Sequence, residues 1–356
     1  MTAHWIDEDW VLRSGGMCCT RYEGTHYAQD IVKEIYVQYN KYESLRKDHI
    51  CCMVTDTASN MVATGNLLMG PPENCDREAQ SWHGCFAHLL ELTTHHAFND
   101  GHLPGCDGVI KACRSLCNFF SHSNQALEKL KDAQRNLGLH PVGPIQDVST
   151  RWWSTLASLE RLLRLKPFID FGVQQAHWPA SRNLNDDQWK LVKAITDVLK
   201  PFHCAQQMLE GQSYVTISLV PFMVDSIRKK LHTIRDHHDD SRIRHLATYM
   251  YDDYVVRWGD GADDTVFKMH KTLGPLNRPQ GLPLKTMLAA AVDPRTCRMP
   301  FLSDGDKDSI KAALKTYMLN HFKQFVYNPP VVVPYPDVGG PGNYGDDISD
   351  NDDEDL

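Results

Sequence analysis

The segment ICCMVTDTASNM, residues 50–61, decides how the N-terminal part of the chain is expected to fold. Residues 50–55 are a short apolar run, which is typical of a buried strand. Asp56 follows directly, and a buried strand gains nothing from a carboxylate unless that group lies at its end, facing solvent or a ligand. Thr57 or Ser59 can cap the helix that follows. The segment therefore predicts a strand, an acid, a turn and a helix.

The sequence on both sides of this segment also predicts short strands and helices. Residues 1–19 contain two short alternating stretches separated by Ser14-Gly15-Gly16, which indicates two strands joined by turns. Residues 25–42 carry apolar side chains at the three-and-four spacing of a one-sided helix. A second apolar stretch, 81–85, leads into a helix that begins near Phe86. The first hundred residues are thus expected to be α/β.

From about residue 105 the pattern changes to long amphipathic helices. Four apolar stripes have helical spacing: Leu156, Leu159, Leu163; Val192, Ile195, Leu199, Phe202; Val224, Ile227, Leu231, Ile234; and Ile243, Leu246, Met250, Tyr254. Pro201 and Pro221 are expected to kink or bound their helices. After a loop at 274–283, a short apolar segment and a last helix carrying Ile310, Leu314, Met318 and Phe322 complete the pattern.

Composition is that of a globular protein with a charged C-terminal end. The formal net charge is −8, and residues 346–355 hold seven acidic side chains, which leaves 38 acidic and 37 basic residues elsewhere. A near-neutral body neither supports nor excludes nucleic-acid binding, although Arg228-Lys229-Lys230 is a local basic patch. The Pro/Gly-rich and acidic segment 329–356 is expected to be disordered.

The N-terminal residues and the cysteines concern the cellular compartment. No basic start followed by an apolar stretch and no run of 18 apolar residues occurs, so we expect an unexported chain that does not enter a membrane. Eleven cysteines, an odd number, suit free thiols in a reducing compartment. No CxxC spacing occurs, so the usual structural-zinc signatures are missing.

Six segments in order resemble the hAT superfamily of transposases and the zinc finger BED-type proteins derived from them. They are TAHWIDEDWVLRS (2–14), VTDTASNM (54–61), CFAHLLEL (85–92), NFFSHSNQALEKL (118–130), IQDVSTRWWSTLASLERLL (145–163) and AAAVDPR (289–295). The resemblance implies an RNase H-like core with a mixed sheet, interrupted by a large helical insertion. We therefore expect a partial core at 1–98, the insertion at 99–285, a return to the core at 286–328 and the disordered tail.

The resemblance also implies site residues. Family members cut DNA with a metal-dependent trio of carboxylates, and Asp56 matches the second of these acids. Cys85 and His88 match a C-x-x-H signature, in which we expect His88 to serve the catalytic site and Cys85 to be structural. Arg151 and Trp152 match an Arg-Trp signature that lies near a flipped base, so both are expected to contact nucleic acid.

The other two carboxylates of the trio have no match in this sequence. The strand that carries the first would precede Met1, and the segment of the form S-E-x-x-F-S that carries the third is replaced by Pro-rich sequence after Val326. The BED zinc finger is also absent. Two-metal chemistry needs several carboxylates, and one carboxylate holds Mg²⁺ poorly. Asp56 alone therefore predicts a weak metal site, and Mg²⁺ is expected only if another chain completes the trio.

Each of these residues also has a purely structural interpretation. Asp56 could cap the turn after its strand. Cys85 and His88 share one helix face, where a buried thiol beside a hydrogen-bonded histidine competes with zinc binding, which would need two further ligands. Trp152 and Trp153 could stack on a base or pack in the core, and the departure from the family pattern at Trp153 favours packing there.

Two classes of function remain open at this point. The first is a transposon-derived protein, not catalytic, that binds DNA or protein, with DNA, other transposase-like chains or a second copy as partners. The second is a metal-dependent transposase or nuclease whose missing carboxylates come from a partner chain. A fragment without a selected role is the third possibility. The relatives imply a nuclear location, and the acidic tail would bind basic protein rather than phosphate.

Overall fold

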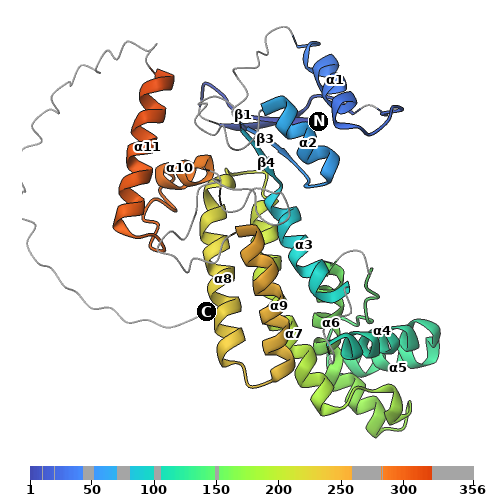
Figure 1. Cartoon of the computed structure of the whole chain (residues 1–356). Coiled ribbons are helices and arrows are strands. Elements are labelled where there is room, and N and C mark those ends of the chain that lie inside the picture. Colours follow the sequence, from blue (N-terminus) through green and yellow to red (C-terminus); the bar gives the residue numbers. More distant parts are fainter. Residues whose placement is uncertain are drawn as a thin grey trace, which may run out of the picture.

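The computed structural model describes residues 1–9, 11–19, 21–42, 52–69, 81–99, 106–148, 152–258, 282 and 284–322. Over this part of the chain the structure is mostly helical, with a few short strands near the N-terminus (Figure 1). Arg151, the loop predicted at 274–283 apart from Leu282, and the tail 329–356 lie outside the described residues.

The described strands form two separate sheets of two strands each. Strands β1 (Thr2–Ile6) and β2 (Leu12–Gly16) pair antiparallel, whereas β3 (Cys52–Thr55) and β4 (Ser81–Gly84) pair parallel. Strands occur in the first hundred residues as predicted, but Ser14, Gly15 and Gly16, expected as a turn, lie inside β2, and residues 17–19 are not a strand. Within the described residues the strands do not join into one mixed sheet. An RNase H-like core therefore stays a prediction.

Helices α1 (Ala28–Tyr39) and α2 (Ser59–Met69) accompany these strands and pack on each other. Helix α2 connects β3 to β4 and lies against β4 through a close contact. A Cβ atom added to Gly65 would come within 2.3 Å of the Trp82 ring, so only glycine allows this approach. The indole N–H of Trp82 also donates to Thr55 Oγ1 at 2.9 Å, which ties β4 to β3.

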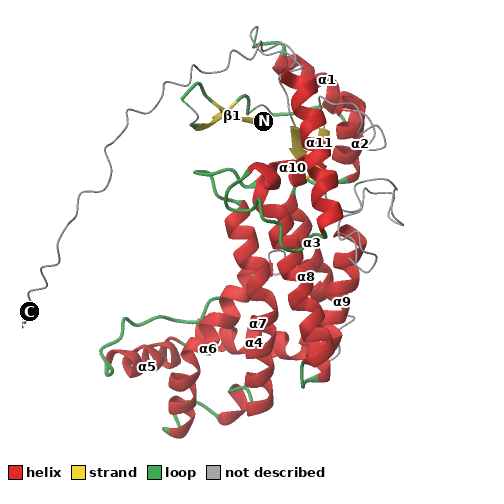
Figure 2. Ribbon diagram, turned by 90° about the vertical axis from the view of Figure 1, so that its left-hand side faces the viewer, coloured by secondary structure: helices red, strands yellow, loops and turns green. Residues whose placement is uncertain are grey.

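The rest of the described chain is a helical body. Helix α3 (Phe86–Asn99) leaves β4 and leads to α4 (Cys106–His122), α5 (Asn124–Arg135), α6 (Trp152–Gln174), α7 (Asp186–Leu209), α8 (Val220–His237) and α9 (Ser241–Trp258). Figures 1 and 2 show α7, α8 and α9 running side by side, with the shorter α4 and α5 packed at one end. The last three apolar stripes predicted from the sequence are buried throughout, as are Leu156 and Leu159 of the first.

Three prolines lie within the described long helices of the body, two of them in helix interiors and one in a first turn. Pro201 lies inside α7, as Pro167 does inside α6, whereas Pro221 lies at the start of α8. A proline in the first turn of a helix lacks only an N–H group that has no intrahelical acceptor, so Pro221 fits there without loss.

Two helices complete the described chain, α10 (Leu284–Val292) and α11 (Asp304–Phe322), which pack on each other. Helix α10 also contacts α8 and the short 3₁₀ helix η4 (Ile217–Leu219). In α11, Ile310 is buried but Met318 is 50% exposed, so the apolar stripe predicted for this helix is only partly buried. None of the described helices combines the length and the hydrophobicity that crossing a bilayer requires.

Candidate functional site

The carboxyl ends of β3 and β4 bring the first predicted site residues to one edge of the parallel sheet. Asp56 follows β3 directly, and Cys85 follows β4, which is its neighbour in register. The backbone N–H of Cys85 donates to Thr55 O at 2.6 Å, so the two strand ends are joined there. His88 lies in the first turn of α3, three residues beyond Cys85. This edge is where α/β sheets usually bind ligands.

The Asp56 carboxylate closes the turn between β3 and α2. Its Oδ1 accepts the backbone N–H of Ala58 at 3.1 Å, and the side chain is exposed. Beside it, the hydroxyl of the buried Thr57 makes no hydrogen bond within the described residues. A Cβ atom on Gly84 would come within 2.5 Å of the Thr57 methyl group, so β4 closes tightly on this turn. This hydrogen bond is the one expected if Asp56 caps the turn after its strand.

The donors around Asp56 do not fit a two-metal centre. Among the residues that the structure describes, no three His, Cys, Asp or Glu side chains are grouped closely enough to hold an ion. Magnesium prefers an octahedron of oxygen ligands, and paired ions share several carboxylates. The exposed carboxylate of Asp56, already in a turn hydrogen bond, offers at most a single ligand from its own side chain.

Trp152 begins α6 and is packed in the core, because only 4% of its surface is exposed. Its ring meets His203 of α7 edge to face, with 6.2 Å between the ring centroids. Stacking on a base would need this side chain to leave the core. Trp153 is the more exposed of the two, at 38%, so Trp152 contributes more to the core.

The residues around Trp152 form a clamp that the sequence did not predict. The carboxylate of Asp147, 3% exposed, accepts two N–H groups of Arg114 and the hydroxyl of Thr155. The Ser154 hydroxyl bridges the backbone N–H and C=O of Val148, at 2.8 and 3.0 Å. Residues 145–148 of the family motif are therefore held between α4 and α6 through the Asp147 carboxylate and the Ser154 hydroxyl.

A second polar cluster joins α3 to α9. Asp253 accepts two N–H groups of Arg257 and the hydroxyl of Thr93, and lies 3.2 Å from His96 Nδ1. Burial raises the pKa of Asp253, but the hydrogen bonds from Arg257 and the others outweigh it and leave this pKa below its usual value. The cluster links the helix that leaves the parallel sheet to the helical body.

The AAAVDPR segment has a similar structural use. Its acid, Asp293, accepts hydrogen bonds from the Arg295 guanidinium and, at 2.5 Å, from the Ser218 hydroxyl in η4. Arg295 also donates to Val215 O at 2.9 Å. The Arg295 and Ser218 hydrogen bonds hold the pKa of Asp293 well below its usual value. This carboxylate fixes the end of α10 to the segment before α8.

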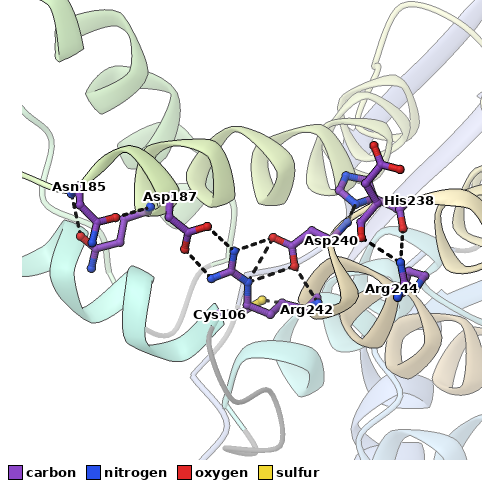
Figure 3. A network of polar contacts seen from close by, with 9 residues as sticks. Cys106, Asn185, Asp187, His238, Asp240, Arg242 and Arg244 are labelled. Carbon is purple, nitrogen blue, oxygen red and sulfur yellow. Dashed lines mark hydrogen bonds and ion pairs between the residues drawn. The ribbon is translucent and has the colours of Figure 1, made fainter.

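A fourth set of polar contacts ties the start of α7 to the start of α9 (Figure 3). The Arg242 guanidinium makes a two-pronged pair with Asp187, at 2.8 and 3.0 Å, and a second pair with Asp240. Arg244 donates to the carbonyl oxygen of His238 in the same turn. The Nε, Nη1 and Nη2 groups of Arg242 all donate to carboxylates of the protein. We therefore assign this arginine a structural role and not a role in ligand binding.

Comparison with known proteins agrees with the motif order. The model of the ZBED1 RNase-like helical domain matches residues 84–198. The chain is 25% identical over 237 residues to human zinc finger BED domain-containing protein 4, and 26% identical over 233 residues to the putative AC transposase of Zea mays.

These alignments cover 65% and 62% of this chain, but only 19% and 27% of the two relatives. The chain thus spans about a fifth to a quarter of the length of these proteins. On these matches the chain is a homologue of the zinc finger BED domain-containing proteins and of the AC transposases, the hAT family that its six sequence segments resemble.

Proposed function

We propose that this chain is a transposon-derived protein that acts by binding, to DNA or to other transposase-like chains including its own copies, and does not cut DNA by itself. One observation carries the proposal: three acids within the family-like segments already have partners in the protein. Asp147 is paired with Arg114, Asp293 with Arg295, and Asp56 holds the turn to α2. A carboxylate that already neutralises an arginine is a poor magnesium ligand.

The helical body supports a binding role because it is well packed and large. Buried side chains of the described residues within 84–198, the range that matches the family model, share one hydrophobic core with α8, α9 and α10. A rigid helical surface can present side chains to a partner without a catalytic centre. By resemblance to its relatives, we also propose that the protein works in the nucleus.

Two assays on the purified full-length chain test this proposal. A mobility-shift assay with double-stranded DNA measures binding, and incubation of the same DNA with Mg²⁺ or Mn²⁺ measures cleavage. We expect a shift that weakens as salt increases, because phosphate contacts release counterions, and no cleavage above the protein-free control. If DNA is not shifted, sedimentation of the chain alone and with a related chain tests binding to protein.

The matched variants are Asp56→Ala and Asp197→Ala. Asp197 is an acid of α7 whose side chain is 47% exposed and pairs only with Lys193 among the described residues. Both should behave as the unchanged chain. Metal-dependent cleavage that Asp56→Ala abolishes and Asp197→Ala preserves would contradict the proposal and favour the nuclease. Absence of DNA and protein binding alike would leave no support for a binding role.

A further inference from the structure

Helix α8 has an outer face that carries cations. Its inner positions Val224, Ile227, Leu231 and Ile234 are buried, whereas Ser226, Lys229, Lys230, Thr233 and His237 are exposed at the complementary helical spacing. In Figure 1, α8 stands at the outer edge of the helical body. The exposed positions therefore form one accessible strip, which we call the α8 strip.

The charge of the α8 strip is not balanced locally. Arg228 and Lys229 both bind the single carboxylate of Asp225, at 2.9 and 2.7 Å, and that carboxylate is buried. Lys230 makes no ion pair with any described residue. Lys229 thus shares its only printed acid with Arg228, and Lys230 has no acid of its own among the described residues, so the α8 strip carries a net positive charge.

Elsewhere on the described surface, many exposed cations are matched by their own acid. Lys193 pairs with Asp197 and Lys311 with Asp308, each within one turn of its helix. In the next turn of α8, Arg235 and His232 both lie against Asp236. The positive charge of the α8 strip therefore lies around Lys230, and Thr233 and His237 extend the same face.

The chain itself contains a polyanion of matching sign. Residues 346–355 hold seven acidic side chains, in a protein whose remaining residues are close to neutral. We propose that this acidic segment docks in cis on the α8 strip and covers it. The inference goes beyond the binding function, because it assigns a regulator: a polyanionic partner would reach the α8 strip only by displacing the segment.

The tether is long enough for this contact. Twenty-three residues separate Phe322, the last described residue of α11, from Asp346. A chain of that length reaches at most roughly 80 Å, at about 3.3–3.6 Å per residue. Helix α8, with 18 residues, is about 27 Å long at roughly 1.5 Å per residue. Tethering of this kind gives effective concentrations on the order of millimolar, so even a weak ionic contact is populated.

Zero-length carbodiimide cross-linking of the full-length chain tests the docking. The reagent joins a carboxylate to a lysine amine that touches it, and mass spectrometry identifies the joined peptides. We expect cross-links from residues 346–355 to Lys229 and Lys230, within single chains, that fall at least about fivefold in 0.5 M salt because ionic contacts are screened. Cross-links spread evenly over Lys111, Lys190 and Lys315, or found only between two chains, would overturn the proposal.

A variant pair gives a second readout that does not depend on lysine chemistry. Lys230→Glu with Thr233→Glu reverses the α8 strip and leaves the Asp225 pairs in place, and Lys315→Glu with Thr316→Glu makes the same change on the exposed face of α11. In ¹⁵N–¹H spectra, the amide signals of residues 346–356 should sharpen in the α8 variant only. Signals equally sharp in the unchanged chain at low salt would contradict docking.

Discussion

The described residues within 1–69 and those within 84–322 differ in where their apolar side chains lie. In the first part Leu68 is the one buried apolar side chain among the described residues, and Trp5 and Val54 are about half exposed. In the second part whole stripes of α6, α7, α8 and α9 are buried in one core. The helical body therefore carries its own stability, while the strands and α1 add little by burial.

This difference bears directly on function. Asp56, the acid that resembles a catalytic residue, belongs to the poorly buried part, whereas the paired acids Asp147, Asp253 and Asp293 connect elements of the helical body. A catalytic centre needs side chains held rigidly by packed neighbours. The described N-terminal part offers little packing of that kind, and the helical body uses its acids for structure.

The largest expected effect is the loss of stability when a buried side chain of the helical body is truncated, compared with truncation of a side chain in the N-terminal strands. Leu162→Ala, at a fully buried position of α6, should lower the free energy of unfolding by about 2–5 kcal/mol, because it removes buried methyl groups and leaves a cavity. Trp5→Ala, at a half-exposed position of β1, should change it by roughly 0.5 kcal/mol or less. Urea unfolding followed by circular dichroism measures both, and equal losses would break the comparison.

A smaller effect is expected at the clamp before α6. Arg114→Ala leaves the buried Asp147 carboxylate without its guanidinium, and a buried polar group that loses its partner costs about 1–3 kcal/mol. Arg164→Ala, an exposed arginine of α6 with no ion pair to a described residue, serves as the control. Thermal unfolding of the two variants compares them. A loss no greater than the control's would mean that the clamp does not stabilise the helical body.

The smallest effect concerns pH. The pKa of Asp253 is depressed in the folded chain, so its contribution to stability is complete above its unfolded value, near 4, and is lost as the pH falls below it. In Asp253→Asn, the free energy of unfolding should therefore fall less between pH 6 and pH 3 than it does in the unchanged chain. Unfolding measured at both pH values checks this, with Asp197→Asn as the exposed control. An unchanged difference would show that this carboxylate does not contribute.

Much of the helical body could be predicted from the sequence because helical spacing reports burial directly. The stripe from Val192 to Phe202 in α7 is buried at every predicted position. The same logic would have placed Trp152 in the core, because it precedes Leu156 by four residues and Leu159 by seven, on the buried face of α6. The sequence left core packing open for Trp152, and only its match to the family motif favoured contact with nucleic acid.

The polar connections could not be predicted in the same way. Arg114 and Asp147 are 33 residues apart, and Thr93 and Asp253 are 160 residues apart, so their pairing follows from how the helices pack. The apolar runs in the sequence predicted that Asp56 and Cys85 lie at the ends of two strands. The sequence did not show that these ends are neighbours, which follows from the parallel pairing of β3 with β4. The sequence thus indicated which side chains could be functional, and the structure showed which residues they contact.

Manganese binding by the full-length chain tests the central claim. The claim is that Asp56, Asp147 and Asp293 make contacts within the protein and do not bind metal ions. Electron paramagnetic resonance of free Mn²⁺ during a titration counts bound ions, for the unchanged chain and for Asp56→Asn. The account predicts the same weak binding in both, since Asp56 supplies one exposed carboxylate that already caps a turn. Two tightly bound ions that disappear in Asp56→Asn would contradict it.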